Sequence, residues 1–165
     1  MMSRRNTLMG LGAATAAFAG VRSLFAGQAA QPARAYEVTH TDEEWRKLLP
    51  GESFYVMRKA GTERPGSSPL NGEHRTGVFN CAGCALPLFS SKAKFESGTG
   101  WPSFYQPIAN TAVDEAASGS RMFGIEVHCH RCGGHLGHVF NDGPKPTGLR
   151  YCINGVALNF SATAL

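Results

Sequence analysis

The sequence predicts a mainly β domain that is preceded by short helices. From Thr76 onward, short apolar runs alternate with glycine, proline and asparagine, as in strands joined by tight turns. That part of the chain contains no internal repeat and no run with the apolar spacing of a helix. Two Cys-x-x-Cys pairs each follow an expected strand, which is typical of a small β domain that carries a metal.

The helical part begins near Thr41. Thr41 can cap a helix, and Glu44, three residues later, can complete a capping box. Pro50 and Gly51 end this helix, and residues 54–59 form either a second short helix or a strand, since periodicity does not decide. The residues expected on the buried side of the first helix are Trp45, Leu48 and Leu49.

Six apolar runs are expected to be strands. The dipeptide Asn154-Gly155 lies between the last two, where it favours a tight turn that joins them as a hairpin. The expected strands are residues 77–80, 86–90, 121–128, 135–140, 149–153 and 156–160.

The net charge of the chain resides in its first 35 residues. The chain carries +4 overall, and residues 1–35 contain four arginines and no acidic residue, so the remainder is neutral. A neutral domain lacks the concentrated positive charge that binds phosphate backbones, which disfavours a nucleic-acid binder.

Residues 1–35 are interpreted as a twin-arginine export signal and linker that is cleaved from a domain of residues 36–165. Arg4 and Arg5 precede a run rich in glycine and alanine that Arg22 interrupts, so the run is too short to span a bilayer stably. Cleavage after Ala30 or Ala35 fits the small residues there, and the expected location is the bacterial periplasm. A disordered basic tail is the alternative.

Four of the five cysteines form two pairs with metal-ligand spacing. Two such turns complete a tetrahedron of thiolates around Zn²⁺, and four protein ligands make the site structural because no position is open to substrate. Two disulfides or a redox-active dithiol are the alternatives. His128 and His130 flank one cysteine and are expected at the surface or behind the ligands. The four cysteines are Cys81, Cys84, Cys129 and Cys132.

The fifth cysteine, Cys152, has no partner. Arg150 and Asn154 lie two residues to either side, so an extended strand points all three side chains to the same face. A guanidinium beside a thiol stabilises the reactive thiolate, so Cys152 is a candidate nucleophile. The alternative is an inert buried thiol beside a solvated arginine.

Longer motifs resemble type B methionine sulfoxide reductases over about residues 38–160. They include Gly100-Trp101-Pro102-Ser103-Phe104 and the run from Arg131 to Phe140. Thr62-Glu63-Arg64-Pro65, Asp142-Gly143-Pro144 and Arg150-Tyr151-Cys152-Ile153-Asn154 also match. The resemblance implies two antiparallel sheets that form an open barrel-like domain around a zinc clip.

The resemblance also implies an oxidoreductase that reduces the R epimer of methionine sulfoxide, free or in proteins, in the repair of oxidative damage. Cys152 would attack the sulfoxide sulfur, and Trp101 and Phe140 would bind the substrate. His138, or else His135, would protonate the departing oxygen. Asp142 would line the pocket with the two histidines, although it also suits the start of a turn. Arg150 and Asn154 would support the thiolate.

One position departs from the family pattern. Many members place a second cysteine just before Gly-Trp-Pro-Ser-Phe, where this chain has Thr99. With four cysteines on the metal, none remains to resolve a sulfenic acid at Cys152, so an external thiol, thioredoxin-like or small, is expected as reductant. We expect a monomer. The rival functions are a non-catalytic zinc-clip binding module and a zinc-containing thiol enzyme that acts on another electrophile.

Overall fold

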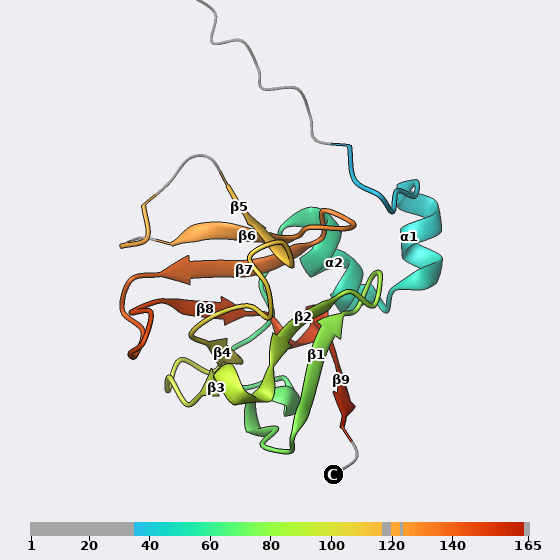
Figure 1. The fold of residues 1–165 in the computed structure, drawn as a ribbon. Helices are drawn as coiled ribbons and strands as arrows, with labels where there is room; N and C mark the ends of the chain where they lie inside the picture. The colour runs from blue at the N-terminus through green and yellow to red at the C-terminus, as the bar shows by residue number, and fades with distance from the viewer. Residues whose placement is uncertain (1–34, 117–119, 123, 164–165) are drawn as a thin grey trace, which may run out of the picture. The chain divides into compact units, whose positions relative to one another are not determined.

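Short antiparallel strands form most of the structure. The computed structural model describes residues 35–116, 120–122 and 124–163. Within these ranges, one sheet has the order β2-β1-β9 and a second has the order β3-β4-β8-β7-β6-β5 (Figure 1). All strand pairs are antiparallel, which confirms the predicted fold class. The strands are β1 (Gly77–Cys81), β2 (Pro87–Ser90), β3 (Lys94–Phe95), β4 (Ser103–Phe104), β5 (Val113–Glu115), β6 (Ile125–Cys129), β7 (His135–Phe140), β8 (Arg150–Ile153) and β9 (Leu158–Ala162).

The first helix, α1 (Asp42–Leu48), has the predicted capping box. The Thr41 hydroxyl accepts the Glu44 N–H at 3.3 Å, and the Glu44 carboxylate accepts the Thr41 N–H at 2.8 Å. Trp45 and Leu49 are buried as expected. The prediction was wrong for Leu48, which is 58% exposed. The helix ends at this residue and Leu49 is already extended, so the chain turns inward only after Leu48.

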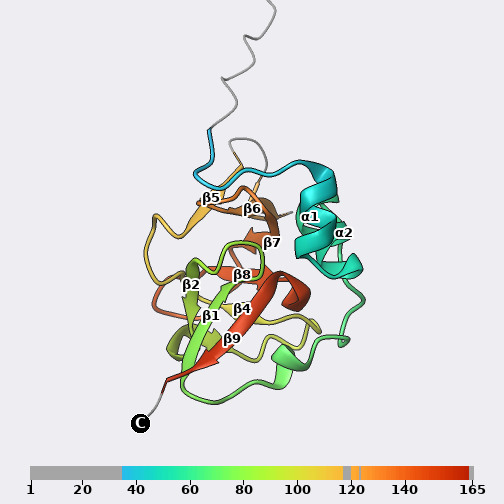
Figure 2. The same cartoon turned by 90° about the vertical axis from the view of Figure 1, so that its right-hand side faces the viewer.

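The ambiguous segment after Pro50 is a second helix, α2 (Gly51–Lys59). It buries Phe54, Val56 and Met57 and packs against β7 of the larger sheet. In Figure 2, both helices lie on the same side of the domain. No helix in the described part of the chain is long and apolar enough to cross a membrane.

Aromatic side chains fill the space between the two sheets. Phe79 and Phe89 come from the smaller sheet and meet Phe104 of the larger one at ring centroid distances of 5.0 and 4.4 Å. Phe104 and Tyr151 lie opposite one another on β4 and β8, so this face of the larger sheet belongs to the core. The opposite face is therefore available for a site.

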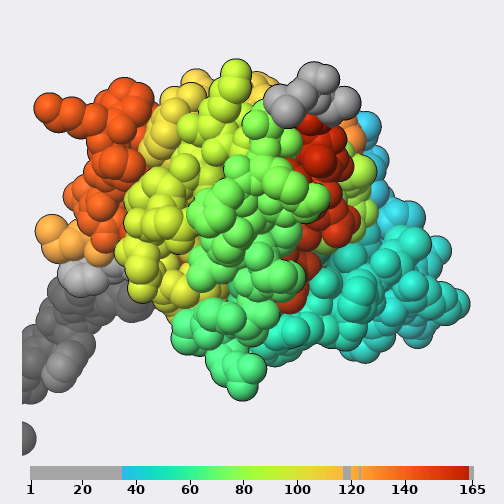
Figure 3. All heavy atoms as spheres, turned by 90° about the horizontal axis from the view of Figure 1, so that it is seen from below, coloured from blue at the N-terminus to red at the C-terminus, as the bar shows by residue number. Residues whose placement is uncertain are grey.

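Three short 3-10 helices complete the domain: η1 (Pro69–Gly72), η2 (Ser91–Ala93) and η3 (Gly155–Ala157). Seen from below, the green segment around η1 covers this side of the domain beside the red spheres of β9 (Figure 3). The N-cap of η1, Ser68, is buried, and the contact of η1 with η3 fixes the end of β8.

The predicted hairpin at Asn154-Gly155 is wrong. η3 follows β8, and β9 pairs with β1 in the other sheet, so the chain changes sheets at this dipeptide. Gly155 is held in place because its N–H donates to the buried Glu63 carboxylate at 2.7 Å. Ser68 also packs directly against it, since a Cβ at this position would lie 2.0 Å from Ser68 Oγ. Tertiary contacts override the local turn preference.

Most predicted strands occur within two residues of their expected bounds. The strand expected from Arg121 begins at Ile125 instead. The strands β3, β4 and β5 were not predicted, because two or three residues are too few to show a period of two. The predicted export signal and linker, residues 1–35, lie outside the described residues except for Ala35.

Candidate active site and metal centre

The two Cys-x-x-Cys pairs form matching turns at the ends of β1 and β6. In the first turn Ala85 donates its N–H to the carbonyl of Cys81, and in the second Gly133 donates to the carbonyl of Cys129, both at 2.8 Å. Ala85 and Gly133 each adopt the left-handed conformation, with φ of 57° and 66°. Because the two turns share this geometry, each presents its pair of sulfurs in the same way.

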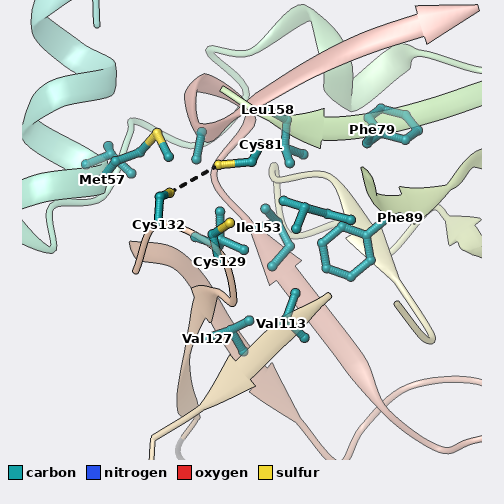
Figure 4. Close-up of a cluster of buried hydrophobic side chains, with 14 of the residues drawn as sticks. Met57, Phe79, Cys81, Phe89, Val113, Val127, Cys129, Cys132, Ile153 and Leu158 are labelled. Carbon is teal, nitrogen blue, oxygen red and sulfur yellow. Dashed lines mark hydrogen bonds between the residues drawn. The ribbon is translucent and has the colours of Figure 1, made fainter. Parts of the chain in front are cut away.

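The four sulfur atoms lie within 4.8 Å of one another. The Cys81 and Cys132 Sγ atoms are 3.7 Å apart, and those of Cys84 and Cys129 are 3.5 Å apart. Figure 4 shows Cys81 and Cys132 facing each other beside Met57 of α2. Ligands of a tetrahedral zinc with Zn–S bonds of about 2.3 Å are separated by about 3.8 Å. The sulfurs therefore have the spacing of a four-thiolate metal site, and none of the cysteines forms a disulfide.

The cysteine cluster joins the two sheets, because Cys81 ends β1 of the smaller sheet and Cys129 ends β6 of the larger one. The flanking histidines make other contacts, as expected. His128 contacts Glu126 at 3.0 Å and His130 contacts Asp114 at 3.0 Å.

Cys152 lies on the face of β8 that points away from the core. Burial alternates along β8, with Tyr151 and Ile153 buried while Arg150 and Cys152 are half-buried. This confirms that Arg150 and Cys152 share a face, as the period of two predicted.

The register of the larger sheet places Cys152 in a row of polar residues. Cys152 lies opposite Ser103 of β4 on one side and His138 of β7 on the other. His138 in turn lies opposite Glu126 of β6. Directly opposite residues have Cβ atoms about 5 Å apart. The sheet therefore brings hydroxyl, thiol, imidazole and carboxylate groups together on one face.

A pocket of about 170 Å³ opens beside Cys152 and His138 of this row. Trp101 and Phe140 give it apolar walls, whereas Asn154 and His138 bring polar groups. A cavity of this size accommodates a short side chain. The lining residues are Thr62, Trp101, Gly137, His138, Phe140, Cys152 and Asn154.

Gly137 permits the close approach of β7 to β8 beside Cys152. A Cβ at this position would lie 2.1 Å from the carbonyl oxygen of Cys152, which neither strand could accommodate without moving. A side chain there would separate His138 from Cys152.

Glu63 holds the pocket walls in place, although sequence reasoning assigned it no role. Its carboxylate is buried and accepts the N–H groups of Gly155 and Val156 at 2.7 and 2.9 Å. Its own N–H donates to the Asn154 side chain at 2.9 Å, and its carbonyl accepts the Trp101 indole N–H at 3.2 Å. One residue thus fixes two sides of the pocket. The only signal in the sequence was that Glu63 lies in the Thr62-Glu63-Arg64-Pro65 motif, which is part of the family resemblance.

Asp142 does not line the pocket, contrary to the expectation. Its carboxylate binds the Arg150 guanidinium through two hydrogen bonds, at 2.9 and 2.8 Å. Arg150 also lies 4.3 Å from the centre of the Phe140 ring. The hydrogen bonds that Arg150 donates to Asp142 raise the pKa of Arg150, and negative charge on Cys152 raises it further, against the opposing effect of burial. Asp142 therefore orients the cation that faces the thiol.

His135 also lies behind the pocket and does not line it. Its side chain is buried, and its ring centroid is 5.5 Å from that of His138. Burial lowers the pKa of His135, while the hydrogen bond from its Nδ1 to Glu126 acts in the opposite direction. His138 is thus the histidine that can touch a bound substrate.

Thr99, at the position where a resolving cysteine was sought, directly contacts Cys152. Its Oγ1 lies 3.8 Å from Cys152 Sγ and 2.8 Å from Ser97 Oγ. Ser97 Oγ also lies 2.7 Å from Ser103 Oγ, within hydrogen-bond distance. A series of hydroxyl groups therefore leads away from the thiol, and among the described residues no other sulfur lines the pocket.

Comparisons with known proteins show which family this chain is similar to. The model of the SelR domain family matches residues 49–162. Among curated proteins, the peptide methionine sulfoxide reductase MsrB of Leptospira interrogans is 51% identical over 126 residues, which cover 76% of this chain and 96% of that protein. The protein of the same name from Pseudomonas entomophila is 55% identical, over 74% of this chain and 95% of its own. That of Methanosarcina barkeri is also 55% identical, over 74% of this chain and 87% of its own.

Proposed function

Because this chain belongs to the SelR family of type B peptide methionine sulfoxide reductases, we propose that it reduces the R epimer of methionine sulfoxide to methionine. As a member of this family it is an oxidoreductase. The observation that carries the proposal is the position of Cys152, between His138 and Ser103 on the exposed sheet face and beside Trp101 in the pocket.

The reaction transfers one oxygen atom from substrate to enzyme. The Cys152 thiolate attacks the sulfoxide sulfur, and the oxygen, which gains negative charge, takes a proton from His138. The sulfur–oxygen bond of the substrate then breaks. Methionine leaves, and Cys152 carries the oxygen as a sulfenic acid, so the substrate sulfur is reduced by two electrons and the cysteine sulfur is oxidised by two.

The pocket offers a reason for a preference between epimers. The apolar surface of Trp101 and Phe140 suits the methyl group, and His138 on the sheet suits the oxygen. With the attacking sulfur fixed by β8, these two requirements place methyl, oxygen and side chain in one order around the sulfoxide sulfur. Only one epimer satisfies that order.

The R and S epimers, presented separately as N-acetyl-methionine sulfoxide with dithiothreitol as reductant, test the proposed function. We expect the R epimer to be consumed and the S epimer to react at least about a hundredfold more slowly, since its methyl and oxygen are exchanged in the pocket. Chromatography of the methionine formed measures both rates. Equal rates for the two epimers, or turnover of S alone, would contradict the proposal.

We propose that the four clustered cysteines hold Zn²⁺. Four thiolates at this spacing fit zinc, and a site with four protein ligands leaves no open position for chemistry. The ion would stabilise the fold, and the other residues would carry the reaction. In that case Cys152 is the one cysteine not committed to metal.

An external thiol would then complete the catalytic cycle. With Thr99 next to Cys152, no second free thiol reaches the sulfenic acid within the chain. A thiol of a thioredoxin-like protein or a small molecule attacks the sulfenic sulfur and releases water, and a second thiol frees Cys152 from the mixed disulfide.

Intact-mass analysis after one equivalent of R substrate, without reductant, tests the one-cysteine cycle. The native protein should gain one oxygen atom and form no disulfide. Thr99→Cys places a thiol where Oγ1 is 3.8 Å from Cys152 Sγ, so this variant should instead lose two hydrogen atoms by forming the Cys152 disulfide. Thr99→Ser is the matched control and should behave like the native protein. A disulfide in the native protein between Cys152 and a metal-site cysteine would contradict the cycle.

A further inference from the structure

A bulge in β7 brings a second histidine to the active-site face. In a regular strand His135 and His138, three residues apart, point to opposite faces. Here the register shifts between Val127 and His128, which leaves Leu136 as an extra residue on β7. Because of this extra residue, the His135 side chain points to the same face of the sheet as His138, and β-bulges commonly redirect side chains in this way beside active sites. Glu126, opposite His138, then lies within reach of both histidines.

Glu126 contacts two imidazole rings through a single oxygen atom. Its Oε1 is 2.6 Å from His135 Nδ1 and 3.0 Å from His128 Nε2. These three residues are close enough to suggest a metal site. However, two ligands on one tetrahedral zinc are about 3.4 Å apart when the bonds are about 2.1 Å. The 2.6 Å contact is too short for that arrangement and has the length of a hydrogen bond to a carboxylate.

The ionisation of Glu126 decides which ring nitrogen of His135 carries the proton. Burial opposes the charge of Glu126, yet the charge of His128 and the hydrogen bond from His135 hold its pKa below the usual value. An ionised carboxylate only accepts hydrogen bonds, so Nδ1 of His135 must be the donor. Since burial keeps the ring neutral near pH 7, Nε2 bears the lone pair.

The Nε2 atom of His135 is buried and has no hydrogen-bond partner among the described residues. A buried acceptor requires a donor. His138 is the neighbouring ring on the active-site side, with its centroid 5.5 Å away and its plane inclined by 68°. His138 is half-buried and lines the pocket, so its ring has room to rotate toward this nitrogen.

We propose that Glu126 is a positioning residue that fixes His135 with its proton on Nδ1, so that Nε2 accepts the N–H of His138. This inference rests on the proposed reductase function. The second nitrogen of His138 is then unprotonated and faces Cys152, its neighbour across β7 and β8. His138 accepts the thiol proton from Cys152 and, now positively charged, delivers the same proton to the oxygen of the sulfoxide. This series of hydrogen bonds ends at Glu126, which stabilises the positive charge on His138 and loses no proton.

Nitrogen-15 NMR of protein labelled at histidine tests the tautomer directly, because the two ring nitrogens differ in chemical shift according to which is protonated. The native protein should show His135 protonated at Nδ1. Glu126→Met removes the acceptor and should shift His135 toward the tautomer protonated at Nε2. Glu126→Gln retains a carbonyl oxygen at the same place, so it should restore the native tautomer.

Single-turnover formation of methionine from the R epimer tests the consequence. Glu126→Met should slow this step roughly 10- to 100-fold with little change in substrate affinity, and Glu126→Gln should recover most of the rate. A control variant, Glu115→Gln, should remain within about twofold of the native rate. It alters a carboxylate of β5 that bonds Arg121 and Tyr151.

Three outcomes would overturn the proposal. The first is a native His135 protonated at Nε2, and the second is a Glu126→Met variant with the native tautomer or the native single-turnover rate. The third is a second bound zinc per chain that Glu126→Met removes, since Nδ1 would then be a ligand. The NMR measurement needs no substrate, so failure of the reductase assay in the native protein would reject the function and leave the tautomer result standing.

Discussion

Replacing Cys152 with serine should abolish the reduction of methionine sulfoxide while leaving the fold intact. A serine hydroxyl is a far weaker nucleophile than a thiolate and is not ionised near pH 7. The substitution removes the sulfur that Cys152 presents to the pocket and changes the side-chain volume little. The single-turnover yield of methionine from the R epimer should fall at least about a thousandfold. Thermal unfolding and metal content should match those of the native protein.

Thr99→Val is the matched control for this experiment, since Thr99 contacts Cys152 without being the nucleophile. It should retain activity within about tenfold, which is the scale of one lost hydrogen bond to a reacting group. The assay also separates the rival functions. A binding module would be unaffected by Cys152→Ser, and a Cys152→Ser protein that still forms methionine at a tenth of the native rate would remove Cys152 from the mechanism.

The fold class could be predicted because most strands are long enough to show their pattern. The strand β7 was placed at its true bounds, since Gly133-Gly134 precede it and the turn residues Asn141-Asp142-Gly143 follow it. The hairpin at Asn154-Gly155 failed for a tertiary reason. Asn154 bonds the carbonyl of Leu136 at 3.0 Å, and Gly155 bonds Glu63, so contacts more than a dozen residues away decide the local path.

The site could be predicted only where its residues are close together in the sequence. The period of two placed Arg150 on the same face as Cys152, and the repeated spacing of the cysteines marked the four-cysteine cluster. The pairing of Cys152 with His138, and of His138 with Glu126, depends on strand register. Register is set by the packing of the whole sheet, which no single strand specifies.

The bulge that brings His135 to the active-site face is equally invisible in the sequence. Gly137 allows β7 to approach β8 closely, yet a glycine in a strand does not reveal which neighbour will come near. The same holds for Glu63, whose buried carboxylate meets N–H groups some ninety residues later in the chain. The residues that bond to the groups of a site thus come from elements far apart in the sequence, so they are identified only from the structure.

Loss of one metal-site cysteine should unfold the domain. Structural zinc sites contribute about 10–16 kcal/mol of apparent binding free energy in small domains, whereas a typical domain is stable by only about 5–15 kcal/mol. Cys129 is fully buried at the end of β6, so Cys129→Ala would remove a ligand and leave three thiols crowded in the core. The variant should contain no zinc, lose its cooperative thermal transition and exchange its backbone amides freely.

Cys152→Ser provides the matched control, because it also removes one cysteine yet should retain one zinc per chain. The comparison isolates the role of the cluster as the connection between the sheet of β1 and the sheet of β6. If Cys129→Ala remained folded with the native melting temperature, aromatic packing of Phe79 and Phe89 on Phe104 would suffice to join the sheets. The pocket depends on that connection, since η3 links the end of β8 to β9 of the smaller sheet and donates a hydrogen bond to Glu63. We therefore expect a chelator that strips the native protein to abolish activity together with the folded state, although no metal ligand touches the pocket.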